Sequence, residues 1–163
     1  MQYRFYGSLA ECGADTAAFP GTAPSGGTLV STVTVTGGVV PDSAVRVFAA
    51  AGTFYWAAFY SGDTDNRAAA SDCATEPLVV LPAATQVTTE LSAPVGQIPV
   101  DGSASDSAVL HGVSASAGGS VQYRFYGSLS ACDADVAAFP GTGPSGGTLV
   151  STVTVAGLSL IHI

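Results

Sequence analysis

Three cysteines are the residues whose type and spacing most clearly predict chemistry. Cys12 returns 120 residues later as Cys132, whereas Cys73 occurs once, because its counterpart would lie beyond residue 163. One full period therefore carries two cysteines, which predicts a disulfide between Cys12 and Cys73 and an oxidising, extracytoplasmic setting. Closing this loop of about 60 residues contributes roughly 4 kcal/mol in the chain-entropy model. Two buried, reduced thiols are the alternative.

Asp63, Asp65 and Asn66 form a second candidate site, because their side-chain oxygens suit calcium and Asp72 or Glu76 follows nearby. Their spacing lacks the twelve-residue pattern and the bidentate glutamate of an EF-hand. Asp and Asn side chains in a loop commonly bond to their own backbone and cap the turn. We therefore predict a turn without a metal or any other cofactor, and keep these three residues as the only metal candidate.

The remaining polar residues do not form a catalytic pattern. A pair of carboxylates that hydrolyses a glycosidic bond needs a cleft and a raised pKa on one member, but the acidic residues here fall in predicted loops and at strand edges. His111 has no nucleophile motif around it and alternates with Ala108 and Leu110, which predicts that it faces solvent. The sequence therefore predicts that the protein is not an enzyme.

Aromatic side chains give the best sequence indication of a binding surface. In residues 53–61, Trp56 and its alternate neighbours share one face of a predicted strand, and Tyr55 and Phe59 share the other. We expect Trp56 to be buried between two sheets. Tyr6, Tyr55 and Phe59 would then face outwards, where they could stack on a glycan or a partner protein. Packing as cross-strand neighbours is the alternative.

An internal repeat determines which elements can position these residues. Residues 2–35 return as residues 122–155 at a constant offset of 120, with no insertion or deletion. The copies differ at five positions: Ala10/Ser130, Glu11/Ala131, Gly13/Asp133, Thr16/Val136 and Ala23/Gly143. Because this period has the size of a small domain and exceeds that of a solenoid unit, the chain is expected to hold about one and a third units of a tandem array.

The repeat also bears on the two ends of the sequence. Met1 stands where the second copy has Val121, so we expect Met1 to be an internal valine read as an initiator, with further residues upstream. After Gly157 the sequence departs from the repeat, and residues 158–163 match a translated transposon adaptor used in library preparation. We expect this tail to be adaptor-derived and non-biological, and exclude it from the fold.

The composition argues against several classes of partner. The chain has twelve acidic residues, four arginines and no lysine, and its net charge is −8. Nucleic acids and anionic membranes both favour clusters of Lys and Arg, so neither is expected as a partner. No apolar run approaches the roughly 20 residues of a membrane-spanning helix, so no membrane insertion is expected.

Alternating and β-branched runs, bounded by Gly, Pro, Asp and Ser, predict short antiparallel strands along the chain. The expected strands are residues 3–9, 28–36, 43–50, 53–61, 76–81, 85–92, 97–101 and 106–113. Residues 10–27 are expected to form a long irregular loop and residues 62–71 a polar loop. Seven or eight short strands in about 120 residues are typical of a β-sandwich.

Four stretches together resemble the bacterial immunoglobulin-like (Big-type) tandem repeats of secreted or cell-wall surface proteins. They are residues 52–63 (GTFYWAAFYSGD), 73–76 (CATE), 106–113 (DSAVLHGV) and 119–126 (GSVQYRFY). The resemblance covers residues 2–156 and implies an all-β, immunoglobulin-like antiparallel sandwich without catalytic residues. The chain departs from antibody domains because Trp56 lies on the same predicted strand as Tyr60, which is not the Cys…Trp…Cys pattern of those domains. In the immunoglobulin strand order, residues 10–27 would have to fold back along the sheet for Cys12 to reach Cys73.

This resemblance divides the chain into parts of two repeats. Residues 1–81 are predicted to be the C-terminal part of one repeat, residues 82–84 a linker, residues 85–157 the N-terminal part of the next repeat, and residues 158–163 the adaptor-derived tail. The implied function is a spacer or stalk in a large extracellular or cell-wall-attached bacterial protein, with neighbouring repeats as partners. The alternative is an adhesive module that binds a glycan or protein ligand through Tyr6, Tyr55 and Phe59.

Overall fold

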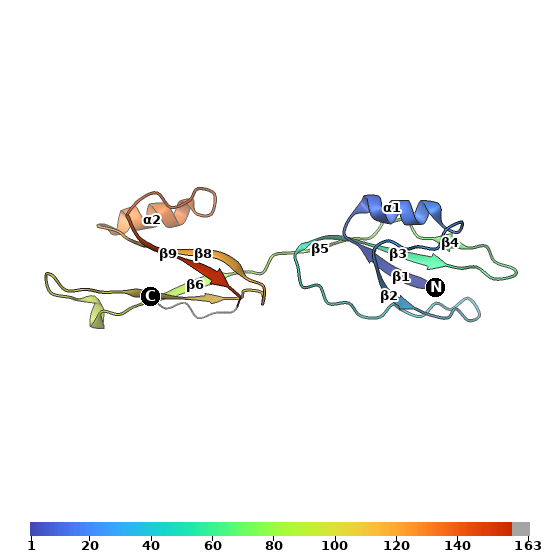
Figure 1. The fold of residues 1–163 in the computed structure, drawn as a ribbon, viewed down its shortest axis with the longest axis horizontal. Coiled ribbons are helices and arrows are strands. Elements are labelled where there is room, and N and C mark those ends of the chain that lie inside the picture. The colour runs from blue at the N-terminus through green and yellow to red at the C-terminus, as the bar shows by residue number, and fades with distance from the viewer. Residues whose placement is uncertain (158–163) are drawn as a thin grey trace. The chain divides into compact units, whose positions relative to one another are not determined.

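The computed structural model describes residues 1–157 and divides the chain into two units, unit 1 (Met1–Pro82) and unit 2, which begins at Ala83 (Figure 1). The division falls within the predicted linker of residues 82–84. Antiparallel strands dominate both units, as the sequence predicted. None of the helices in the described residues is long and apolar enough to cross a membrane. The predicted adaptor-derived tail, residues 158–163, lies outside the described residues.

Unit 1 is built on one antiparallel sheet of five strands. β1 (Gln2–Tyr6) lies between β2 (Thr28–Thr32) and β3 (Gly52–Tyr60), and the other edge of β3 pairs with β4 (Ala69–Ala70) and β5 (Pro77–Val80). The aromatic side chains of β3 suit a central strand, because they pack well against neighbours on a pleated surface. β3 therefore pairs with three of the other four strands of the sheet, β1, β4 and β5.

A helix, α1 (Leu9–Ala18), covers one face of this sheet, where the sequence predicted an irregular loop (Figure 1). Ser8 is its N-cap, and the Ser8 side chain accepts a hydrogen bond of 3.2 Å from the backbone N–H of Glu11. A serine followed three residues later by a glutamate is a start signal for a helix. The signal was missed because four of the ten residues of this helix are alanines, which favour helices without marking a face.

An extended segment, residues 33–51, crosses the opposite face of the sheet. The strand predicted for residues 43–50 is not formed. Phe48 instead packs against Phe5 and Phe54, with 5.4 and 4.8 Å between the ring centroids, and the Arg46 guanidinium lies 4.8 Å from the centre of the Phe5 ring. The segment thus contributes side chains to the sheet face, whereas a strand would add backbone hydrogen bonds along an edge.

Unit 2 repeats the strand–helix–strand arrangement of unit 1. β8 (Gly118–Phe125), α2 (Leu129–Ala138) and β9 (Thr148–Ala156) occupy the positions of β1, α1 and β2 after an offset of 120 residues. Ser128 caps α2 as Ser8 caps α1. The two copies differ in the last strand, because β9 runs to Ala156 whereas β2 ends at Thr32, four residues short of the predicted end.

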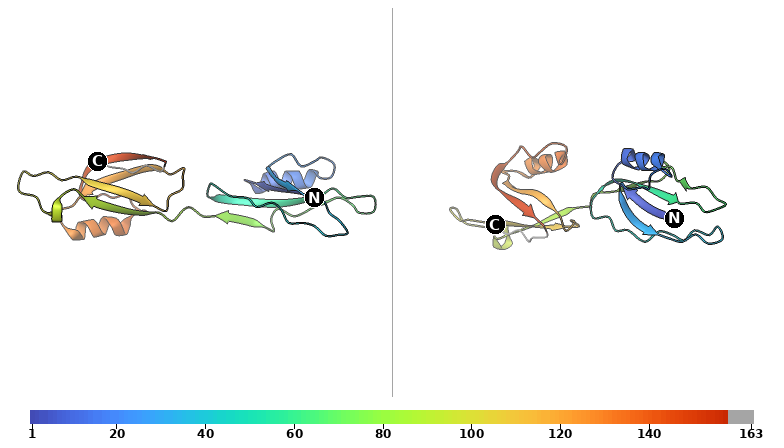
Figure 2. Two further views of the ribbon diagram at one scale, coloured as in Figure 1. Left: turned by 90° about the horizontal axis from the view of Figure 1, so that it is seen from below. Right: turned by 45° about the vertical axis from the view of Figure 1, so that its right-hand side comes forward.

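Unit 2 also contains a separate hairpin formed by β6 (Gln86–Leu91) and β7 (Asp106–His111) (Figure 2). The strand predicted for residues 97–101 is wrong, since turns connect β6 to β7 and the Gly102 N–H bonds to the Pro99 carbonyl. The buried side chains of unit 2 come from both of its sheets: Ala108, Tyr123 and Val155. Each of the two sheets thus contributes at least one buried side chain.

The first prediction concerns the packing beneath α1. Phe59→Ala should lower the free energy of unfolding of unit 1 by about 3–5 kcal/mol, the range for deleting a buried aromatic side chain. Trp56 is the only tryptophan of the chain, so its fluorescence during denaturant unfolding reports on unit 1 alone. Val45→Ala removes a side chain that is 96% exposed and should change this free energy by less than about 0.5 kcal/mol. Equal effects of the two substitutions would contradict the packing.

Candidate functional site

Cys12 and Cys73 form a disulfide in unit 1, with 6.0 Å between their Cα atoms. Cys12 projects from α1, Cys73 lies in the turn before β5, and both residues are buried. The residues after β1 do fold back along the sheet, and they do so as the helix that the sequence analysis missed. The bridge therefore ties α1 to the segment that leads into the last strand of unit 1.

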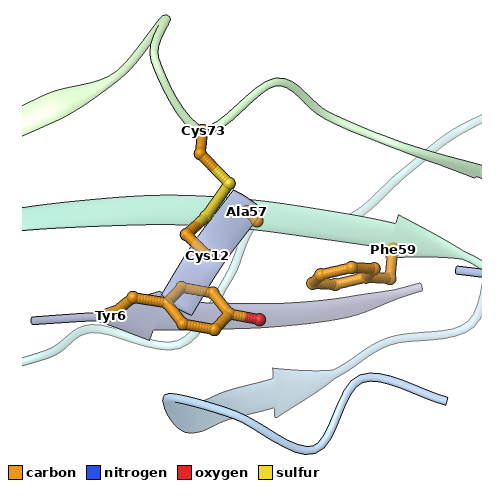
Figure 3. Packing of buried hydrophobic residues seen from close by; sticks show 5 residues of the cluster. All are labelled: Tyr6, Cys12, Ala57, Phe59 and Cys73. Carbon is orange, nitrogen blue, oxygen red and sulfur yellow. A yellow bond between two sulfur atoms is a disulfide. The ribbon is translucent and has the colours of Figure 1, made fainter. Parts of the chain in front are cut away.

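The disulfide belongs to a buried cluster on the face of the sheet under α1 (Figure 3). Tyr6 is 0% exposed and Phe59 is 2% exposed. Phe19, at the end of α1, packs edge-on against Phe59 with 5.3 Å between ring centroids, and Tyr55 lies partly buried against the same cluster. The cluster accounts for most of the fully buried side chains of unit 1.

This packing overturns the predicted ligand face. The alternation along β3 was predicted correctly, because Tyr55 and Phe59 do share a face with Tyr6. The side assigned to solvent was wrong, since α1 covers it and the sequence analysis contained no helix to do so. Tyr6 and Phe59 are therefore not accessible to a ligand in this structure, whereas Tyr55 is only partly buried.

Trp56 lies on the other face and is half-buried. The sequence analysis expected it between two sheets, but in unit 1 its neighbours are Phe5 on β1 and Phe48 on the extended segment, with 6.2 and 6.5 Å between ring centroids. Phe48 and Arg46 of the extended segment pack on this aromatic face, and Trp56 remains half-buried beside them.

A carboxylate fixes the loop that follows α1. Asp15 Oδ2 accepts hydrogen bonds from the Tyr6 hydroxyl at 2.9 Å and from the Gly26 N–H at 2.8 Å. Arg4 Nε donates to the Gly26 carbonyl at 2.9 Å. Burial, followed by the bond to Asp15, raises the pKa of Tyr6 well above its usual range, so the hydroxyl remains a donor. The Asp15 carboxylate thus connects α1 to β1 and to the loop that follows α1.

The same network recurs in unit 2. Asp135 Oδ2 accepts from the Tyr126 hydroxyl at 2.9 Å and from the Gly146 N–H at 2.8 Å, and Arg124 donates to the Gly146 carbonyl. The Gly146 N–H is the main cause that lowers the pKa of Asp135. Of the residues in this network only Tyr6 was a candidate from the sequence, and it was expected to face a ligand, although all four positions are identical in both copies. The network serves the fold of each copy, since it connects residues of one strand–helix–strand element.

Gly27 shows how closely this loop approaches the sheet. Its φ is +57°, and a Cβ atom at this position would lie 2.5 Å from the Phe5 carbonyl oxygen. Only glycine accepts this combination of backbone conformation and contact. Glu11 adds a contact specific to unit 1, because its Oε1 accepts from the Gly27 N–H at 2.8 Å and the second copy has Ala131 instead.

The predicted metal candidates lie together in one loop of unit 1, where Asp63 organises a turn. Asp63 Oδ1 accepts from the backbone N–H groups of Asp65 and Asn66, each at 2.9 Å, and Oδ2 accepts from the Tyr60 hydroxyl at 2.8 Å. The Asn66 side chain presents its Nδ2 to Asp63. The hydrogen bond from Tyr60, followed by those from Asn66 and Asp65, lowers the pKa of Asp63 to about 2. The carboxylate thus acts as a turn cap.

The remaining candidates lie apart from this loop. Asp72 accepts from the backbone N–H of Ala74 in a turn of its own, and Glu76 is exposed. His111 is exposed on β7 and pairs with the Thr88 hydroxyl at 2.9 Å. Within residues 1–157, no group of three or more His, Cys, Asp and Glu side chains is arranged to hold a metal ion.

The geometry defines a β-rich, disulfide-closed module with a helix on one face of its sheet. Comparison of the chain with protein-family models, curated proteins and solved structures gives no match. Among the described residues, the disulfide and the buried cluster around it form the best-defined candidate site.

The second prediction follows from the cysteine pairing. Cys132 is free and half-buried, so alkylation of the unfolded, unreduced chain should add one label per molecule. Cys132→Ser should reduce the count to none, and reduction before alkylation should raise it to three in the original chain. Mass spectrometry measures each count. Three labels without reduction would contradict the disulfide.

The third prediction concerns the turn capped by Asp63. Tyr60→Phe removes the main hydrogen bond that stabilises the carboxylate, so the pKa of Asp63 should rise from about 2 towards its ordinary value of 3.8. An NMR titration of the Asp63 carboxyl carbon measures this value. The folded pKa lies below the unfolded one, so the stabilisation by Asp63 is complete above about pH 4 and is lost as the pH falls towards 2.

Tyr3→Phe is the matched control for this titration. The Tyr3 hydroxyl donates to the Pro41 carbonyl and makes no bond to Asp63, so its removal should leave the Asp63 titration unchanged. An unshifted pKa in Tyr60→Phe would show that the Tyr60 hydroxyl does not hold the carboxylate in its charged form.

Proposed function

We propose that this chain belongs to a tandem array of immunoglobulin-like β-sandwich repeats that serves as a spacer or stalk in a large extracellular or cell-wall-attached bacterial protein. The partners of each repeat are its neighbours in the array. The observation that carries the proposal is the disulfide that closes half of a 120-residue sequence repeat. A covalently closed module of this kind suits a part that must keep its length under load.

The two units supply complementary parts of one repeat. Unit 1 contributes the sheet with β3, β4 and β5, whereas unit 2 contributes the β6–β7 hairpin, and both contain the strand–helix–strand element. Residues 83–155 followed by residues 36–82 therefore make up one complete period. In this assembled repeat the hairpin and the sheet of unit 1 would supply the two layers of a sandwich. The exposure of Phe139, 61% against the half-buried Phe19 of unit 1, supports this view, because unit 2 has no counterpart of Phe59.

The disulfide suits a mechanical role. It joins residues that are 61 positions apart, so a force applied to the two ends of a repeat cannot extend the enclosed chain. Only about half of each period can lengthen while the bridge is intact. The same bond supports an extracellular location, since disulfides persist in oxidising compartments, and the net charge of −8 is compatible with solubility there.

The fourth prediction tests this role by single-molecule stretching of an array of the assembled repeat. Each unfolding event should lengthen the oxidised array by roughly 200 Å and the reduced array by roughly 400 Å, at about 3.4 Å per extended residue. A variant in which serine replaces Cys132 and Cys73 in every repeat should give the longer step without reductant.

Two outcomes would contradict the proposed spacer. An oxidised array that extends without discrete events would not hold its length under load. Equal steps before and after reduction would show that the bridge does not enclose half of the repeat.

A further inference from the structure

A hollow of about 620 Å³ opens in unit 1 beyond the first residue of β1. One wall is formed by Val33, Thr34 and Val35, which follow β2, and the other by Tyr60 and the loop that leaves β3. Because β1 lies between β2 and β3 in the sheet, this hollow continues the path of β1 beyond Met1. We call it the β1 slot.

The hydrogen bonds next to the slot define which backbone groups remain available in it. Met1 and Val33 exchange two hydrogen bonds of 2.9 Å. In an antiparallel ladder such doubly bonded pairs recur at every second residue, so Val35 is the next position due to bond across the slot. Among residues 1–157 no hydrogen bond reaches the N–H or C=O of Val35. The Thr36 N–H is already bonded to the Val39 carbonyl in a turn.

Unit 2 shows what occupies the equivalent position. There Ser120, Gly119 and Gly118 pair with Thr154, Val155 and Ala156, and this pairing lets β9 continue to Ala156. Val155, the counterpart of Val35, is only 5% exposed. β9 is therefore longer than β2 because residues 118–120 extend the strand that pairs with it.

We propose that the β1 slot seats an extended segment with the sequence of residues 117–120, Ala-Gly-Gly-Ser, joined to the amino group of Met1. The segment would add to the sheet by backbone hydrogen bonds to Val35, as in β-strand addition. Gly119 has a φ of +103° in unit 2, so the slot selects glycine at the position that faces Val35. The inference rests on the proposed function, because it assigns the slot to the strand that completes a repeat.

The experiment compares the original chain with a chain that carries Ala-Gly-Gly-Ser before Met1. Hydrogen exchange of the Val35 amide, followed by NMR, should slow by about five- to tenfold, the factor expected for one net backbone hydrogen bond. The amide of Val39, which bonds to Thr36 in both chains, provides the internal reference. The melting temperature of unit 1, followed by Trp56 fluorescence, should rise with the same extension.

A second extension, Ala-Gly-Pro-Ser, is the matched control. Proline at the position that faces Val35 cannot adopt the positive φ of Gly119 and has no N–H to donate to the Val35 carbonyl. This extension should therefore not seat in the slot, and the Val35 amide should exchange as in the original chain. Equal protection by both extensions, or by neither, would overturn the inference. Failure here would leave the stretching result untouched, because the assembled repeat already contains residues 117–120 and its step lengths depend on the disulfide.

Discussion

The buried cluster of unit 1 depends on the packing of α1 against β3, and the Cys12–Cys73 disulfide ties α1 to the turn before β5. The cluster under the helix contains few large side chains besides Tyr6 and Phe59. A small domain buries too little apolar surface to be stable by packing alone, and disulfides commonly supply the difference. By joining the helix to the turn before β5, the bridge limits how far these two elements can separate over the buried cluster.

Units 1 and 2 contain nearly the same strand–helix–strand sequence. Comparing them shows which features need only that sequence and which need the rest of the unit. α2 begins and ends at the positions equivalent to those of α1 and has the equivalent N-cap. Tyr126 and Gly146 donate to Asp135 as Tyr6 and Gly26 donate to Asp15. These features need only the strand–helix–strand element. Burial behaves differently, because Tyr6 is fully buried and Tyr126 is not. Strand β3 and Cys73 thus complete a core whose framework is determined locally.

Strand positions along β3, β5, β6 and β7 were predictable, because β-branched and aromatic residues there alternate between turn residues. The cysteine pairing was suggested by counting cysteines per period. The helix was not predicted, since its alanines carry no clear 3.6-residue period and only the Ser8–Glu11 spacing marked its start. That omission then reversed the inner and outer faces of β3. A strand pattern specifies which side chains share a face, but which element covers each face depends on the tertiary structure.

The candidate loop of Asp63 illustrates the same limit at a smaller scale. The residue types Asp, Asp and Asn suit both a cation and a turn, and the sequence left both open. In the structure Asp65 and Asn66 offer N–H donors to Asp63, so the Asp63 carboxylate caps the turn. A cation would need their oxygens to converge. Side-chain composition therefore limits the chemistry of a loop, whereas backbone geometry decides which of the permitted interactions is made.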